Sequence, residues 1–359
     1  MKIATLTFHR ALNYGAILQC YSLQKTIKDL GYESEVLDYD CRMISKDYKL
    51  LSTDSLPKFI KSLLFLPVFY RKKQNYNRFI KRFISVSKEV SYNELANVSS
   101  DYAAFITGSD QVWNYKLTGS DSKYFLDFVP EQKKRLSYAA SFGIREIPKH
   151  LMKFYQRYIN GMGHISVREQ TAAELVGNIC GRKAEVVLDP VFLQRAEDWQ
   201  RLMSENTEKN YIFVYMPGKN TLKAARLLAR TKKLKIIYCA YGYSLRNMRE
   251  NIGDMRLSLG PDEFLTLLNG ADYVLTGSFH ATAFSLIFHK EFFVEVPENV
   301  GSRITDLLNI FGLEKRILNS ELLPENCSTD WLKVSEKMDK LRKSSLMSLQ
   351  KSIEAAVYD

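Results

Sequence analysis

Short apolar stretches with strand character alternate with helical stretches along most of this chain, and no other feature restricts the fold as strongly. The first forty residues show the pattern: an apolar strand at residues 3–8, helical spacing of apolar side chains at 15–30, and a second strand at 33–39. Gly31 follows the helical stretch, as expected of a residue that ends a helix. This unit predicts two parallel strands joined by a helix.

The alternation continues in two blocks. The first block has predicted strands at 103–107, 135–140, 164–167 and 185–188, and helices at 149–160 and 169–180. The second has strands at 211–215, 234–239, 273–276 and 292–296, and helices at 221–231, 264–269, 279–288 and 304–311. The pattern predicts an α/β protein with two facing Rossmann-like domains, residues 1–200 and 201–327. Residues 328–359 show apolar side chains at helical spacing and are predicted to pack back on the first domain as one helix.

The composition of the 359 residues excludes several classes of protein. Hydrophobic residues make up 46% and charged residues 25%, which excludes a disordered or fibrous chain. The cysteines form no CxxC pair, so the sequence predicts no metal site and a reducing compartment; they are Cys20, Cys41, Cys180, Cys239 and Cys327. No apolar run approaches the roughly 18 residues needed to span a bilayer, and the first ten residues do not resemble a signal peptide. We therefore expect a cytoplasmic protein.

Polar and aromatic residues follow the first and third strands of the first block. In open parallel sheets, ligands bind beyond the carboxyl ends of the strands, next to helix N-termini. Hydrogen-bonding and stacking side chains at such positions suit a sugar. We predict a sugar-binding surface after the third strand, from Ser109, Gln111, Trp113 and Asn114. After the first strand, the segment with Asn13, Tyr14 and Gly15 offers the N–H groups of the following helix to an anion or a hydroxyl. The alternatives are a plain βα turn and an Asx-type turn beside a core tryptophan.

Further candidates stand at other junctions between a strand and a helix. His280 follows the good N-cap Ser278 in the sequence TGSFHATA, so it should lie in the first helical turn, whose positive end favours anions. Arg168 and Arg303 stand at two more junctions, and a guanidinium suits a carboxylate or phosphate. These residues predict an anion site. The alternatives are a buried histidine satisfied by backbone groups and an Arg168 that pairs with Glu169.

Residues 56–90 form a basic, aromatic-rich segment that is predicted as a helical pair. Nine cations accompany one acid, Glu89; they are Lys58, Lys61, Arg71, Lys72, Lys73, Arg78, Lys81, Arg82 and Lys88. This composition is typical of a helix on a membrane surface, where each cation contributes roughly 1 kcal/mol. The alternative is a helix with an apolar core stripe and a solvated basic face. The net charge of +11 is accompanied by no recognised nucleic-acid-binding module, so no nucleic-acid partner is expected.

Seven segments resemble, in this order, the polysaccharide pyruvyl transferase family: TFHRALNYGAILQCYSLQ, FITGSDQVWN, LSYAASFG, ISVRE, VLDPVFL, VLTGSFHATAFSLIF and SRITDLL. The resemblance covers most of the chain. One departure is Ala281, where glycine is usual in the family. Members of the family are similar to two-domain glycosyltransferases of the GT-B type, which have facing Rossmann-like domains and their active site in the cleft between them. This expectation agrees with the two blocks of strands and helices.

The resemblance implies transfer of a pyruvyl group from phosphoenolpyruvate to a sugar of a polysaccharide or lipid-linked oligosaccharide, with a pyruvate ketal formed and phosphate released. Phosphoenolpyruvate is a co-substrate, and no cofactor is expected. The first domain would hold the acceptor through both groups of residues named above, after its first and third strands, and the second domain would hold the donor. His280 is expected as the acid and Asp110 as the base, and the donor would be bound by Arg168, Ser278, His280 and Arg303. Peripheral contact with the inner membrane face is also expected.

Two other functions remain open for the same fold. A nucleotide-sugar glycosyltransferase would release a nucleotide instead of inorganic phosphate. A non-catalytic glycan-binding protein would bind the acceptor but not phosphoenolpyruvate.

Overall fold

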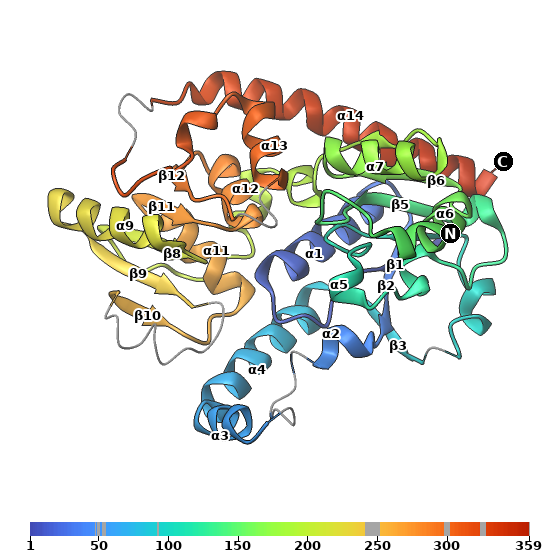
Figure 1. Ribbon diagram of the computed structural model, residues 1–359, viewed down its shortest axis with the longest axis horizontal. Helices are drawn as coiled ribbons and strands as arrows, with labels where there is room; N and C mark the ends of the chain where they lie inside the picture. The colour runs from blue at the N-terminus through green and yellow to red at the C-terminus, as the bar shows by residue number, and fades with distance from the viewer. Residues whose placement is uncertain are drawn as a thin grey trace.

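The computed structural model describes residues 1–46, 48, 51, 55–91, 93–240, 252–297, 302–323 and 328–358. Cys327, at the predicted end of the second domain, lies outside the described residues. The described elements form two parallel sheets with helices around them, side by side in Figure 1.

Seven parallel strands form the first sheet, in the spatial order β3-β2-β1-β4-β5-β6-β7. Their bounds are β1 (Lys2–Leu6), β2 (Glu33–Tyr39), β3 (Val86–Val90), β4 (Ala104–Thr107), β5 (Arg135–Ala140), β6 (His164–Val167) and β7 (Glu185–Val186). The central strand β1 is apolar because both faces of the sheet are covered: Ile3, Ala4 and Leu6 are fully buried. The carboxyl ends of β1 and β4 therefore meet at one edge of the sheet.

The helices of this part are α1 (Tyr14–Asp29), α2 (Arg42–Lys46), α3 (Leu56–Leu64), α4 (Leu66–Phe83), α5 (Tyr115–Thr118), α6 (Met152–Asn160), α7 (Gln170–Cys180) and α8 (Ala196–Gln200). Short 3₁₀ turns are η1 (Asn97–Ser100), η2 (Ser122–Phe125), η3 (Gln132–Lys134), η4 (Lys149–Leu151) and η5 (Pro190–Leu193). Helix α1 begins where Asn13 caps it, with Asn13 Oδ1 accepting a hydrogen bond from the Ala16 N–H at 3.2 Å.

Five parallel strands form the second sheet, in the order β10-β9-β8-β11-β12. They are β8 (Tyr211–Tyr215), β9 (Lys235–Cys239), β10 (Asp254–Arg256), β11 (Tyr273–Thr276) and β12 (Glu291–Val294). Its helices are α9 (Lys219–Lys232), α11 (Pro261–Gly270), α12 (Phe279–Ile287) and α13 (Ser302–Phe311), followed by the turn η6 (Glu314–Arg316).

The last helix, α14 (Trp331–Tyr358), runs along both sheet regions, as its course in Figure 1 shows. Near its start, the Trp331 ring stacks on His289 of the second part, with ring centroids 5.1 Å apart. Near its end, Leu349 and Ile353 are buried in a cluster with residues of β1, β4 and β5. One helix thus contacts both sheet regions.

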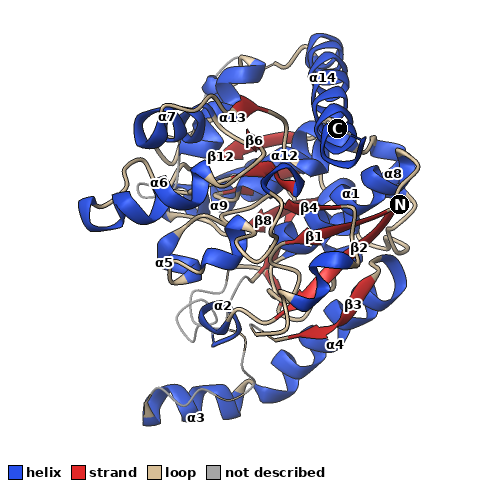
Figure 2. Ribbon diagram, turned by 90° about the vertical axis from the view of Figure 1, so that its right-hand side faces the viewer, coloured by secondary structure: helices blue, strands red, loops and turns tan. Residues whose placement is uncertain are grey.

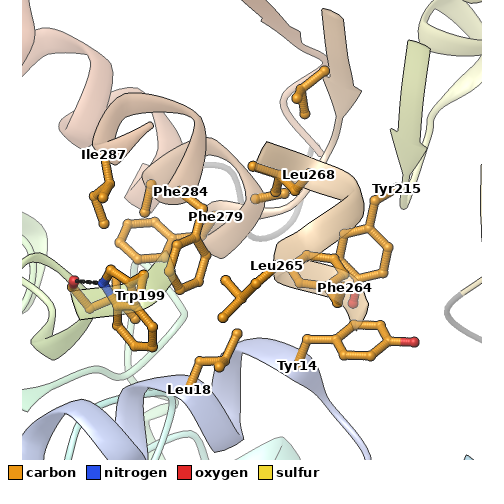
Figure 3. Packing of buried hydrophobic residues seen from close by; sticks show 14 of the residues in the cluster. Tyr14, Leu18, Trp199, Tyr215, Phe264, Leu265, Leu268, Phe279, Phe284 and Ile287 are labelled. Carbon is orange, nitrogen blue, oxygen red and sulfur yellow. Dashed lines mark hydrogen bonds between the residues drawn. The ribbon is translucent and has the colours of Figure 1, made fainter. Parts of the chain in front are cut away.

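A continuous apolar core joins the two parts (Figure 3). Tyr14 of α1 stacks on Phe264 of α11 with ring centroids 4.4 Å apart, and Leu18 of α1 belongs to the same buried cluster. Trp199 of α8 packs edge-on against Phe284 of α12 at 5.0 Å. This core brings the first turn of α1 close to the first turn of α12, where the candidate site lies.

The predicted α/β class is confirmed, and most strands fall within one or two residues of their expected bounds. The helical pair predicted over residues 56–90 is wrong at its end, because Val86–Val90 forms the strand β3. Among the described residues, β3 is a half-exposed edge strand that pairs with β2 alone. Its local sequence carries little strand pattern, and tertiary pairing decides its structure. The short edge strand β10 was not predicted for the same reason.

Candidate active site

His280 lies in the first turn of α12, directly beyond the carboxyl end of β11. Ser278 is the N-cap residue, and its Oγ accepts a hydrogen bond from the Ala281 N–H at 3.4 Å. The unpaired N–H groups and the positive end of the helix dipole favour an anion at this position. Only 7% of His280 is exposed, so the ring lies in a largely desolvated site.

The imidazole of His280 packs directly on the backbone of Gly15 in the first turn of α1. A Cβ atom added at Gly15 would lie 2.0 Å from His280 Nδ1 and 2.3 Å from its Cγ. Glycine is therefore required here because a histidine from the second domain occupies the space of a side chain. The prediction that Gly15 binds the acceptor is wrong in this arrangement, since the ring covers the position.

Replacing Gly15 by alanine is expected to lower activity at least about ten-fold, because the new methyl group must displace the imidazole from its position. The backbone itself should tolerate the change, since alanine is favoured over glycine by up to about 1 kcal/mol within a helix. Steady-state kinetics and thermal unfolding of the variant would measure both effects.

Gly177→Ala is the matched control, because it makes the same change in helix α7, where the added Cβ has no atom within 4 Å beyond its chain neighbours and the backbone of its own helix. It should leave activity unchanged. Equal activity of Gly15→Ala and the wild type would contradict the close contact between Gly15 and His280.

Asp189 lies beside His280 and is completely buried. Its Oδ2 accepts hydrogen bonds from Ser109 Oγ at 2.8 Å and Arg168 Nη1 at 2.7 Å. Its Oδ1 accepts one from the N–H of Val191, which makes Asp189 the N-cap of η5. The distance from Oδ2 to Nε2 of His280 is 3.7 Å, too long for a hydrogen bond but close enough for strong electrostatic coupling. Sequence reasoning missed this residue, although the segment VLDPVFL places it where a strand gives way to a turn.

The ionisation of the acids in this cluster follows from their partners. Burial by itself would raise the pKa of Asp189, but His280 and Arg168 outweigh it and hold that pKa well below its usual range. Burial raises the pKa of Glu169, because its nearest opposing group, Arg168, does not fully compensate. Asp189 is therefore an anion at neutral pH. It supplies one negative charge next to Arg168 and His280.

Two guanidinium groups flank the ring of Phe279, the first residue of α12. The Arg168 Cζ lies 4.4 Å from the ring centroid and the Arg303 Cζ lies 6.0 Å from it. Burial, together with the nearby charge of Arg168, lowers the pKa of Arg303 to about 10. In the described part of the chain, Nε and Nη2 of Arg168, Nε of Arg303 and Nε2 of His280 are buried without a hydrogen-bond partner. Such unsatisfied donors are costly to bury, and an anion could satisfy those it reaches.

A cavity of about 270 Å³ opens between the two domains at this point. It is lined by several of the predicted site residues: Asn13, Asp110, Gln111, Ser278, His280 and Arg303. Asp110 has a φ of 76°, in the left-handed region, and its Oδ1 accepts a hydrogen bond from the N–H of Gln111. The same oxygen lies 4.0 Å from Arg303 Nη1. An acid, a histidine and an arginine from two domains thus share one small cavity.

The family model for polysaccharide pyruvyl transferase matches residues 13–297 of this sequence, a span that includes every residue of this cluster except Arg303. The chain belongs to the polysaccharide pyruvyl transferase family. A search among curated proteins gave no significant match.

Solved structures support the GT-B type of fold for this member of the family. S. aureus MnaA, determined with UDP, aligns with a TM-score of 0.52 and 12% sequence identity over 98% of this chain and 91% of that protein. A protein of Listeria monocytogenes assigned as a UDP-N-acetylglucosamine 2-epimerase aligns with a TM-score of 0.51 and 11% identity over 96% and 90% of the two chains. At these identities the similarity concerns the fold: two facing Rossmann-like domains.

Several residues predicted to bind the acceptor have structural positions instead. Trp113 is 1% exposed, stacks on Phe125 and donates its indole N–H to the carbonyl of Tyr124, so it belongs to the core and its assignment is wrong. Tyr14 is equally buried against Phe264, and its hydroxyl donates to the carbonyl of Leu259, so its assignment is wrong too.

Two more acceptor residues also differ from expectation. Ser109 is fully buried and holds Asp189, which makes it a positioning residue and corrects its assignment as a sugar ligand. Asn114 is 4% exposed; its Oδ1 caps α5 and its amide donates to Gln111 Oε1. Of the predicted acceptor group, Asn13 and Gln111 alone line the cavity within the described residues.

Arg168 also lies deeper than predicted. Its side chain is 2% exposed, it is absent from the described lining of the cavity, and its charge faces Asp189, Glu169 and Asp110. The alternative of an Arg168 paired with Glu169 describes part of this arrangement, with 3.6 Å between Arg168 Nε and Glu169 Oε2. In this geometry Arg168 contacts Asp189 and Phe279. Direct binding of the donor by Arg168 stays a prediction.

A second, larger cavity of about 620 Å³ adjoins the first, since Ala11 and Tyr48 line both. The carboxyl ends of β1 and β2 supply several of its charged groups, and α4 supplies Lys73 and Lys81. His9 Nε2 lies 2.8 Å from Asp38 Oδ1, and Arg10 Nε donates to the same oxygen at 2.7 Å. Sequence reasoning missed these residues, because the signal is a pairing between two strands that only the sheet brings together.

The described residues contain no group of three or more histidine, cysteine or acidic side chains arranged to hold a metal ion. Among the helices of that same part, none is long and apolar enough to cross a membrane.

Proposed function

We propose that this protein transfers a pyruvyl group from phosphoenolpyruvate to a sugar of a polysaccharide or lipid-linked oligosaccharide, forming a pyruvate ketal and releasing phosphate. The observation that carries the proposal is the placement of His280 at the N-terminus of α12, with Arg303 and Asp110 in one interdomain cavity. Membership of the polysaccharide pyruvyl transferase family supports a transferase of this kind.

The donor is a small molecule with a carboxylate and a phosphate, and the positive groups of the second domain suit both. Ser278 and the free N–H groups at the start of α12 can bind one anionic group. Arg303, which lines the cavity, can bind the other through its planar fork of donors. Arg168 supports them from behind Phe279.

The chemistry requires one acid and one base. His280 would donate a proton to the methylene carbon of phosphoenolpyruvate, which makes C2 electrophilic; histidine exchanges protons readily near neutral pH. A sugar hydroxyl would then form a C–O bond to C2 while Asp110 accepts its proton. The oxygen of a second sugar hydroxyl would then bond to C2 and close the ketal. The bond between C2 and the bridging oxygen of the phosphate breaks, and the departing phosphate takes the proton of that hydroxyl. This route uses no metal or redox cofactor, which stays a prediction.

The second cavity is the natural place for the rest of the acceptor. It adjoins the catalytic cavity and belongs to the first domain, and its acids and cations offer hydrogen bonds to sugar hydroxyls and to any phosphate attached to them. We therefore propose that the bound acceptor extends from Asn13 and Gln111 in the first cavity to the His9–Asp38 pair in the second.

The cellular site of this reaction is proposed from the cysteines. Cys20, Cys41, Cys180 and Cys239 are free, as expected for a reducing compartment. We therefore propose a cytoplasmic enzyme.

The function is tested by incubating the protein with phosphoenolpyruvate and polysaccharides from which mild acid has removed pyruvate ketals. The expected result is release of inorganic phosphate in step with pyruvate bound to the glycan, measured by mass spectrometry. UDP-N-acetylglucosamine is the parallel donor. Release of UDP in place of phosphate would favour the glycosyltransferase, and glycan binding without turnover of either donor would favour the non-catalytic alternative.

A further inference from the structure

Helix α3 carries a complete apolar stripe that faces solvent. Its large apolar side chains recur at helical spacing, and each is between 39% and 71% exposed; they are Leu56, Phe59, Ile60, Leu63 and Leu64. Figures 1 and 2 both place α3 at the outer end of α4, away from both sheets. Soluble proteins rarely expose so continuous an apolar surface unless something binds it.

The pair of helices α3 and α4 is strongly cationic. Between Ser55 and Lys88 the sequence contains no aspartate or glutamate. The exposed cations on α3 and α4 are Lys61, Arg71, Lys73, Arg78, Lys81 and Arg82. An apolar stripe beside cations without any acid is complementary to an anionic surface with an apolar interior.

One cation of this segment is not at the surface. Lys72 is 3% exposed and lies 5.2 Å above the ring of Tyr14. Tyr76 and Phe79 of α4 are buried on the same side. The inner face of α4 thus fixes the pair of helices to the body of the protein, and Lys72 does not belong to the exposed basic face.

We propose that α3 and the outer face of α4 bind the surface of an anionic lipid bilayer. The apolar stripe would enter the boundary between headgroups and acyl chains, and the cations would contact the headgroups. Nucleic acid fits this surface less well, because its affinity rests on phosphate contacts and leaves five large aliphatic or aromatic side chains uncovered.

Membrane binding would also position the second cavity relative to the bilayer. The role of that cavity as the acceptor site rests on the proposed function. Helix α4 lines the second cavity with Lys73, Tyr76 and Asn77. A protein docked through α3 would therefore hold this cavity next to the bilayer surface, where a lipid-linked sugar is anchored.

Vesicle flotation with the full chain tests the proposal without any donor or acceptor. The wild type should float with vesicles that contain about one third phosphatidylglycerol and not with pure phosphatidylcholine, and salt should release it as the charges are screened. Each cation near an anionic surface strengthens binding roughly five-fold, so Arg71→Glu/Lys73→Glu should weaken the partition at least about twenty-fold.

Two further variants complete the design. Ile60→Ser/Leu63→Ser keeps the charge and should also weaken binding at least about ten-fold, because it removes apolar side chains that would be buried in the interface. Lys337→Glu/Lys340→Glu makes the same charge change on the exposed side of α14 and should bind like the wild type. Circular dichroism checks that each variant is folded.

Absence of flotation by the wild type at low salt would overturn the proposal. It would favour a protein partner as the molecule that covers the apolar stripe of α3. Equal weakening by the α3–α4 and α14 charge variants would overturn it too, because it would show a nonspecific effect of net charge. Since no substrate is present, neither outcome depends on whether the proposed transferase activity is correct.

Discussion

Replacing His280 by alanine should lower kcat for pyruvyl transfer by about 10²–10⁴-fold, the usual loss when a positioned proton donor is removed. The imidazole is the group in the described lining of the cavity best suited to protonate the donor, and it lies at the positive end of α12. Asp189 retains Arg168 and Ser109 as partners, so the folded structure should persist. Steady-state kinetics with phosphoenolpyruvate and thermal unfolding measure the two outcomes separately.

His150→Ala is the control, because His150 is exposed and lies outside the described lining of both cavities. It should retain full activity. A His280→Ala protein that keeps more than about a tenth of the wild-type kcat at saturating donor would remove His280 from the role of acid.

Replacing Asp189 by asparagine should cost about 3 kcal/mol of stability at neutral pH, the low end for breaking a buried ion pair. Arg168 would lose its closest carboxylate, 2.7 Å from Nη1, and keep only Asp110 and Glu169 at 3.8 and 3.6 Å. Urea unfolding measures the loss. Asp101→Asn, at an exposed position, is the control and should change stability by less than about 0.5 kcal/mol.

The stability difference between the wild type and Asp189→Asn should also depend on pH. The pKa of Asp189 is depressed in the folded state, and in the unfolded chain an aspartate titrates near about 3.9. Its contribution is therefore fully present above about pH 5 and is lost as the pH falls towards the folded-state pKa. A difference that grew on acidification would contradict the depressed pKa.

The strands of the two sheets and the helices that cover them could be predicted because their sequence patterns are local. Apolar side chains alternate along strands and recur every three to four residues along helices, whatever the rest of the chain does. The strand at Arg135–Ala140 was predicted to the residue. Two edge strands were missed, since β3 and β10 exist through pairing with a neighbour and not through their own pattern.

The site was predicted only in outline. His280, Arg303 and Asp110 stand at junctions between a strand and a helix, and the parallel sheets bring such junctions together, so their meeting in one cavity could be anticipated. Trp113 and Tyr14 follow strands in the same way but are core residues. Position after a strand indicates which edge of the sheet a residue occupies, and it does not indicate whether its side chain points outward or into the core.

By itself, the sequence determined the alternation of elements, the division into two Rossmann-like domains and the junctions from which a site could be built. Only the tertiary structure decided which groups act and which support them: Asp189 joins Ser109 from 80 residues away, and Gly15 makes room for His280 from the other domain. The physical reason is the distance along the chain over which each kind of interaction acts. Strand and helix periodicity depends on neighbours in sequence, whereas burial, charge pairing and close packing depend on contacts between distant segments, which exist only once the two domains have folded against each other.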